Sequence, residues 1–295
     1  MTDINTNYKS LLEDTALDQY FAPGCSYTEM RVKISDDVNL YCIKIMPPAA
    51  TDNPVVMFIP GWISRITSWQ HALRELTRDH AVIYVETRDK TSSQLAKSTS
   101  LSVKSIASDI MYLIKYFELE SGKYLLFGSS LGATAILESY VQLITRPRAF
   151  ILVGPNAEFK IPWWGSILIF LFPPPLYLVM RPFLKWYLKT FRLDIDADQD
   201  QYNKYCENLD DTDPYKLKKA ASSLQHYRVW ELLPDINLPV LIFGSDVDHL
   251  HDPGNISQML PLLPDATLIN MTNNTHTHSS DMVIKLREYI RNLDN

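Results

Sequence analysis

The sequence predicts an α/β fold: a mostly parallel, doubly wound sheet with an inserted helical cap. Short apolar runs typical of buried strands alternate with helix-like segments along most of the chain. This alternation stops over residues 155–231 and then resumes, which indicates an insertion into one sheet rather than a separate C-terminal domain. An apolar run also leads directly into Gly128-Ser129-Ser130-Leu131-Gly132, and small residues typical of a closely packed helix follow that turn.

The chain opens with a predicted β-hairpin and continues with the alternating elements. Residues 27–34 and Val38–Met46 alternate apolar and polar side chains on either side of a polar turn. We then expect strands at Val55–Ile59, 81–85, 124–127, Ala149–Val153, 240–243 and 266–271, and helices at 68–78, 103–117, after Gly132, near 256–262 and at 281–293. The three expected parts are an N-terminal extension (1–22), a sheet domain (23–154 and 232–295) and the cap (155–231).

Composition narrows the class of protein. With 295 residues, 46% of them hydrophobic, the chain can bury a large core. Its net charge is −6 and no basic block dominates, so we expect no nucleic-acid partner. Cys25, Cys42 and Cys206 are too few and too widely spaced for a disulfide framework or a zinc pattern. The N-terminal residues also lack the basic start and apolar run of a signal peptide, and we therefore predict a cytoplasmic protein.

Ser130 stands where a strand must turn at once into a helix. Such a corner leaves little room, and Gly128 and Gly132 supply the small residues it needs. The residue between them is forced onto a sharp turn, with its side chain above the carboxyl end of the strand. Ser130 is therefore the candidate nucleophile; the alternative is an ordinary glycine- and serine-containing turn.

A serine nucleophile needs a histidine as general base and a carboxylate that holds the histidine. In a parallel sheet these groups come from loops at the carboxyl ends of strands. "GSDVDHLHDP" follows the predicted strand 240–243, and "TNNTHTHSS" follows the last predicted strand. The order along the chain is thus serine, acid, histidine.

In these segments the chain resembles the α/β-hydrolases, over nearly its whole length from about Tyr27. "FGSSLGA" is similar to the family's nucleophile elbow, "MFIPGW" to its first strand-end segment and "ETRDKTSS" to its D-x-R-G-x-G-x-S loop. The resemblance implies an oxyanion hole made by the backbone N–H groups of Trp62 and Leu131. Asp89 and Thr91 stand where that loop usually has glycines.

The resemblance also ranks the candidates for acid and base. Asp248, with an aliphatic residue two positions on and a proline soon after, fits the family pattern better than Asp246, which is held in reserve. Counting along the last strand places the base at His276, with His278 in reserve because we expect the alternate histidine of an extended loop to point elsewhere. The predicted triad is therefore Ser130, Asp248 and His276.

A metal site is the rival interpretation of the two histidine-containing loops. "DVDHLHD" and "HTH" contain imidazoles and carboxylates, which suit zinc or iron. We favour the triad and interpret His249 and His251 as ordinary loop residues, so neither a metal nor another cofactor is expected.

The cap segment suggests an apolar substrate. Residues 161–180 carry no charge, but Pro173-Pro174-Pro175 would break a membrane-spanning helix. Beyond them, a basic stripe and an apolar stripe share one amphipathic helix. The basic stripe is Arg181, Lys185, Lys189 and Arg192, and the apolar stripe is Leu184, Tyr187, Leu188 and Phe191. Such a helix either packs its apolar side on the core or forms a lid that contacts membrane lipid.

A serine at the elbow implies acyl transfer through an acyl-enzyme. The expected function is hydrolysis of an apolar carboxylic ester, as by a carboxylesterase or a lysophospholipase-like enzyme. An acyltransferase or a thioesterase would use the same triad. A non-catalytic relative that only binds an apolar ligand is the third alternative.

Overall fold

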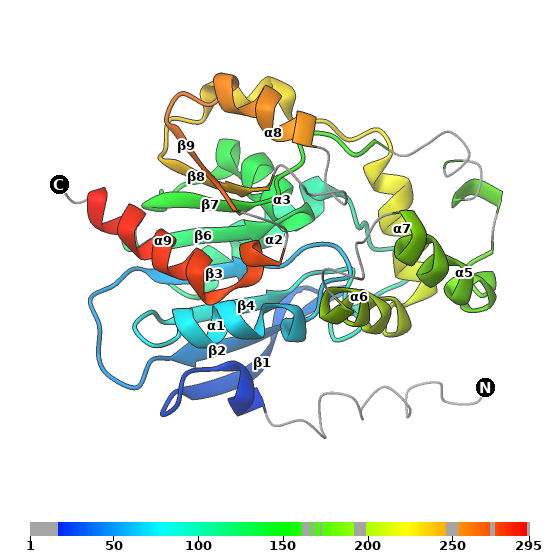
Figure 1. The fold of residues 1–295 in the computed structure, drawn as a ribbon, viewed down its shortest axis with the longest axis horizontal. Helices are drawn as coiled ribbons and strands as arrows, with labels where there is room; N and C mark the ends of the chain where they lie inside the picture. Colours follow the sequence, from blue (N-terminus) through cyan, green and yellow to red (C-terminus); the bar gives the residue numbers. More distant parts are fainter. Residues whose placement is uncertain are drawn as a thin grey trace.

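The computed structural model describes residues 17–160, 166, 169–171, 173–191, 199–245, 253–271 and 275–293 (Figure 1). Its centre is a nine-stranded sheet in the order β1-β2-β4-β3-β6-β7-β8-β9, with the short β5 paired to β2. The strands are β1 (Ser26–Ser35), β2 (Val38–Met46), β3 (Val55–Ile59), β4 (Val82–Glu86), β5 (Gln94–Leu95), β6 (Tyr124–Ser129), β7 (Ala149–Val153), β8 (Val240–Gly244) and β9 (Ala266–Asn270).

The sheet is antiparallel at one edge and parallel elsewhere. β1 and β2 form the predicted hairpin, and β2 pairs antiparallel with β4. From β4 through β3, β6, β7 and β8 to β9 every pairing is parallel. Parallel strands need helical crossovers, which cover both faces, and β6, β7 and β8 are accordingly buried at every residue. The predicted fold class is thus confirmed.

Helices cover the two faces of the sheet and close two apolar cores. One core contains buried residues of α1 and α9, and the other contains those of α2, α3 and α8. In α2, Ser102 caps the first turn by accepting a hydrogen bond from the Ser105 N–H, and the buried residues recur at helical spacing. These helices are α1 (Gln70–Leu76), α2 (Val103–Tyr116), α3 (Leu131–Ser139), α8 (Pro253–Met259) and α9 (Ser280–Asn292).

Short 3-10 helices connect these elements and change two expected boundaries. The expected helix 68–78 is instead a 3-10 turn, Ile66–Trp69, followed by α1. Leu17, Tyr20 and Phe21, which lie in the expected N-terminal extension, pack into the core beside α1. The other 3-10 helices are Leu17–Tyr20, Tyr140–Gln142, Trp230–Asp235, Leu260–Leu262 and His276–His278.

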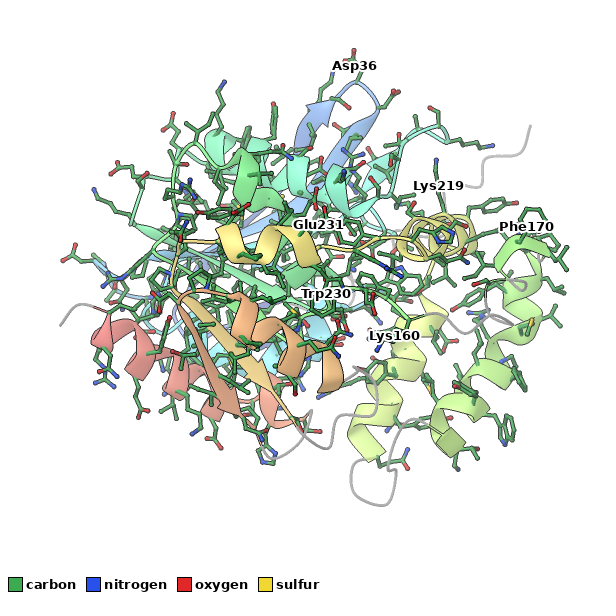
Figure 2. The ribbon with its side chains drawn as sticks, turned by 90° about the horizontal axis from the view of Figure 1, so that it is seen from above. Asp36, Lys160, Phe170, Lys219, Trp230 and Glu231 are labelled. Atoms are coloured by element: carbon green, nitrogen blue, oxygen red, sulfur yellow. The ribbon has the colours of Figure 1, made fainter. Side chains whose placement is uncertain are left out.

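Three described helices between β7 and β8 form the cap: α5 (Leu176–Phe191), α6 (Gln199–Asp210) and α7 (Pro214–Leu224). Figures 1 and 2 both place them on one side of the sheet, and Figure 2 shows Phe170 and Lys219 in this part of the molecule. Polar contacts attach the cap to the sheet domain. Arg65 pairs with Asp211 at 2.8 Å, and Lys219 donates a hydrogen bond to the carbonyl of Lys97. Among the described helices, none is long and apolar enough to cross a membrane.

Candidate active site

The topology places a site between the carboxyl ends of β3 and β6. The chain runs from β3 to β4 on one side of β3, and later returns to β6 on the other side. Ligands of open α/β sheets bind at such switch points, where successive crossovers diverge and leave a crevice. Trp62 follows β3 and Ser130 follows β6, so the two predicted site residues flank this crevice.

Ser130 has the strained backbone predicted for an elbow. Its φ is 46° and its ψ −112°, a conformation that L residues rarely adopt. The surrounding packing imposes this turn, because a Cβ at Gly132 would lie 2.1 Å from the Ile59 carbonyl oxygen. A Cβ at Gly128 would likewise lie 2.6 Å from a side-chain carbon of Ile136. Gly128, Ser130 and Gly132 therefore form a tight, strained turn between β6 and α3, and the catalytic role of Ser130 stays a prediction.

Ser130 opens into a cavity of about 470 Å³ between the sheet domain and the cap. The loop after β3, the end of β6, the cap helices α5 and α6, and the segment before α9 all contribute to its walls. Its lining includes Gly61, Trp62, Ile63, Ser64, Ser68, His71, Ser129, Ser130, Leu184, Tyr187, Leu188, Lys204, Tyr205, Asn208, Leu209, Thr275, His278 and Ser279. This volume lies in the range of small-molecule sites.

Of the two histidines that the sequence offered as the base, His278 lines this cavity with Ser130, whereas His276 is absent from its described lining; His71 of α1 lines it as well. The His278 ring packs against Trp69, tilted by 34° with the ring centroids 4.0 Å apart, and its Nδ1 lies 3.0 Å from the Thr277 hydroxyl. The segment His276–His278 is a 3-10 helix instead of the extended loop expected from the sequence. In that helix each residue turns by about 120°, so residues two apart point in different directions.

The predicted acid cannot be placed with the other candidates. Asp246 and Asp248, together with His249 and His251, lie outside the described residues. The strand before them, β8, ends at Gly244 in the parallel sheet, two strands from β6. Asp248 as the acid, with Asp246 in reserve, stays a prediction.

A buried ion pair holds the loop after β3, whose Trp62 N–H is the predicted oxyanion donor. Asp89 and Lys90 are 4% and 5% exposed, and their charged atoms are 2.6 Å apart. Lys90 donates to the Gly61 carbonyl at 2.6 Å, and the Ile63 N–H donates to Asp89 at 3.1 Å. The pair therefore fixes the backbone on both sides of Trp62.

Electrostatics keep Asp89 ionised in this buried position. Burial raises the pKa of its carboxyl, but the Lys90 ammonium and the hydrogen bonds from Lys90, Thr87 and Ile63 together hold the pKa below its ordinary value. From the cap, Lys216 donates to the carbonyls of Lys90 and Ser93. Burial lowers the pKa of the Lys216 ammonium to about 8.

Replacing Lys90 by methionine should destabilise the protein strongly, because it leaves the Asp89 carboxylate buried without its counter-charge. We expect the free energy of unfolding, measured in urea, to fall by about 3–5 kcal/mol. The double variant Asp89→Asn/Lys90→Met should recover part of this loss. The matched control is Lys33→Met, which breaks the exposed Lys33–Asp36 pair and should cost less than about 1 kcal/mol. Equal losses in Lys90→Met and Lys33→Met would contradict the role of the buried pair.

Asn156 is a site residue that the sequence analysis missed. It is 7% exposed, and its side-chain N–H donates to the Ser130 hydroxyl at 3.4 Å. Thr134 donates to the Asn156 backbone carbonyl at 2.7 Å and so holds this segment against α3. Its position just after the strand Ala149–Val153 could have indicated a site residue, because groups at the carboxyl ends of parallel strands lie together at one edge of the sheet.

Comparisons with solved structures agree on the architecture. No family model and no curated protein sequence matches the chain. An esterase from Thermogutta terrifontis superposes with a TM-score of 0.72 at 17% identity, covering 92% of this chain and 100% of that one. An esterase from Exiguobacterium antarcticum gives 0.71 at 15% identity (91% and 100% covered), and a hydrolase from Oleispira antarctica gives 0.69 at 17% (88% and 94% covered). The chain has the α/β-hydrolase fold.

Within this α/β-hydrolase fold, the cap helix α5 directs its predicted apolar stripe to the cavity. Leu184, Tyr187 and Leu188 of the predicted apolar stripe line the cavity. In the predicted basic stripe, Arg181 and Lys185 both bind Asp210 of α6. The exposed residues of α5 include Lys189 of the basic stripe and the apolar residues Leu178, Val179, Phe183 and Trp186. Contact of this cap with membrane lipid stays a prediction.

The rival metal site was suggested by two histidine-containing loops, of which the structure describes one. No group of three or more His, Cys, Asp or Glu side chains in that part could hold a metal ion. Of the two loops that suggested the site, "HTH" is described, and "DVDHLHD" lies outside the described residues. His278 of the first loop instead lines the same cavity as Ser130.

Proposed function

We propose that this protein is a serine hydrolase that cleaves a carboxylic ester with an apolar part. The observation that carries the proposal is Ser130, which occupies a strained elbow and lines the same cavity as His278. A strained, partly buried serine is costly for stability, and a merely structural turn would not require it. The low-identity likeness to esterases and hydrolases is consistent with this class of reaction but does not carry it.

In the proposed reaction His278 accepts the proton of the Ser130 hydroxyl as its oxygen attacks the ester carbonyl. The carbonyl becomes a tetrahedral oxyanion, which receives hydrogen bonds from the backbone N–H groups of Trp62 and Leu131. Leu131 is the first residue of α3, where helical N–H groups have no acceptor within the helix. The alcohol leaves with the proton from His278, and water then attacks the acyl-enzyme by the same route.

The second histidine and the acid have defined places in this proposal. His276 is the alternative base, and Asp248, with Asp246 in reserve, is the proposed acid that holds the tautomer of the histidine.

The apolar character proposed for the substrate follows from the residues of the cap. Leu184, Leu188 and Leu209 line the cavity, and they can cover an acyl chain or an apolar alcohol.

Covalent labelling by a fluorophosphonate probe tests the proposal directly. We expect the native protein to be labelled at Ser130, because the probe reacts with an activated serine and not with an ordinary hydroxyl. Peptide mapping after labelling identifies the serine. The matched control is Ser129→Ala, which removes the neighbouring hydroxyl that also lines the cavity and should keep the label.

Three outcomes of that experiment would count against the proposal. Absence of labelling in the folded protein would favour a binding protein over an enzyme. Labelling that survives in Ser130→Ala would move the nucleophile elsewhere. Ester hydrolysis that stops on addition of a chelator and persists in Ser130→Ala would support the metal interpretation.

A further inference from the structure

The cavity contains one charged side chain that the proposed reaction does not use. Lys204, on the cap helix α6, lines the same cavity as Ser130 and is partly buried. It makes no hydrogen bond or ion pair with the residues that the structure describes. No acidic side chain is among the described residues that line the cavity. The cavity therefore has a positive charge without a counter-charge in the described part of its wall.

The acidic residues that follow Lys204 on α6 and just beyond it are already paired elsewhere. Asp210 accepts a hydrogen bond from Lys185 of α5 at 2.7 Å. Asp211 pairs with Arg65 of the sheet domain at 2.8 Å, and Glu207 lies 4.0 Å from the same guanidinium. These carboxylates attach α6 to its neighbours. Lys204 has no such structural role, although its ammonium would gain from a nearby anion.

A second polar group lies beside Lys204 on the same face of α6. Asn208 is four residues further on, one helical turn away, and is 4% exposed. Its side-chain nitrogen donates to the Ser68 hydroxyl at 3.4 Å, while its side-chain oxygen is buried without a partner among the described residues. Asn208 also lines the cavity, and its side-chain nitrogen carries a second N–H besides the one donated to Ser68, so this face of α6 has an N–H donor in addition to the ammonium.

From these observations we propose that Lys204 and Asn208 form an anion subsite, which binds a carboxylate or phosphate group carried by the ester substrate. The inference rests on the proposed function, because it assigns a substrate class to the same cavity. The ammonium supplies charge and the Asn208 amide supplies a directed hydrogen bond. Leu184, Leu188 and Leu209 of the same cavity contact the apolar part of the molecule. The substrate class is an ester with an apolar chain and a separate negative charge.

A matched pair of esters tests this subsite. The p-nitrophenyl ester of hexanoic acid and the mono-p-nitrophenyl ester of adipic acid share the leaving group and the number of acyl carbons. They differ in that the second ends in a carboxylate. The quantity compared is kcat/KM for the adipate ester divided by kcat/KM for the hexanoate ester. We expect Lys204→Met to lower this ratio by about tenfold or more, because a hydrogen bond to a charged group is lost. Lys189→Met, on the exposed side of the cap helix α5, is the matched control and should leave the ratio as in the wild type.

A binding measurement keeps the inference testable without turnover. In the wild type, hexyl phosphate and hexanoate should raise the melting temperature more than hexanol does, because ligands that bind the folded state stabilise it. This advantage should disappear in Lys204→Met and persist in Lys189→Met. The comparison of the two anions distinguishes a phosphate-bearing substrate from a carboxylate-bearing one, and an advantage of either anion that depends on Lys204 supports the subsite.

The subsite and the proposed function fail in different ways. If the wild type hydrolyses neither ester and resists the fluorophosphonate probe, the proposed function is wrong, and the binding measurement alone judges Lys204. An unchanged ester ratio in Lys204→Met, or anion binding that does not depend on Lys204, would overturn the subsite even in an active esterase.

Discussion

Replacing Ser130 by alanine should lower kcat/KM for p-nitrophenyl butyrate by about 10⁵-fold, as expected when a nucleophile that acts as part of a unit is removed. No other group would then form the acyl-enzyme, and only the residual effect of the oxyanion donors and of substrate binding would remain. The measurement is the initial rate of p-nitrophenol release, with the rate in buffer subtracted.

The fold should survive this substitution. Alanine has the same Cβ as serine and meets the same backbone conformation, φ 46° and ψ −112°, so the strain of the elbow is unchanged. The bond lost is the 3.4 Å contact from Asn156, and the melting temperature should shift by no more than a few degrees. Ser129→Ala is the matched control for activity and should keep most of it. Turnover above about a tenth of the wild-type rate in Ser130→Ala would exclude Ser130 as the nucleophile.

The elbow could be predicted from sequence because its cause is local. A buried strand that turns directly into a helix requires small residues at Gly128 and Gly132, and Ser130 is the residue midway between them. The parallel sheet was also predictable, since alternating strands and helices have few other ways to bury their apolar faces. Nothing in these two inferences depends on contacts between distant parts of the chain.

The support of the oxyanion loop could not be predicted, because its contacts join distant segments. The sequence showed that Asp89 and Thr91 replace usual glycines but gave no partner for Asp89. In the structure, Lys90 reaches a carbonyl 29 residues away at Gly61, and Lys216 reaches the same loop from the cap. Periodicity identifies the faces of a helix without identifying what packs against each. For the same reason the sequence did not show that Arg181 and Lys185 bind Asp210.

The choice of base depends on the local conformation of the segment before α9. Counting residues along the last strand assumes that the chain stays extended after it, and this favours His276. The structure instead has a 3-10 helix, His276–His278, and brings the second histidine to the cavity. The two candidates for the base, His276 and His278, are therefore only two residues apart, and mutation of each histidine distinguishes them.

His278→Ala should lower kcat/KM by about 10⁴-fold or more, whereas His276→Ala should keep at least about a tenth of the wild-type value. Without a base to accept its proton, the Ser130 hydroxyl is a poor nucleophile, so fluorophosphonate labelling should slow in parallel. Rates on p-nitrophenyl butyrate and labelling rates measure both effects.

Because the His278 ring packs against Trp69, alanine at this position also leaves a space in the packing. His278→Gln is the second variant, since its planar amide fills more of that space but cannot act as a base. If His278→Gln is folded and inactive, the loss belongs to proton transfer and not to packing. If instead His276→Ala is the inactive variant while His278→Ala keeps its activity, the base is His276, and His278 only lines the cavity.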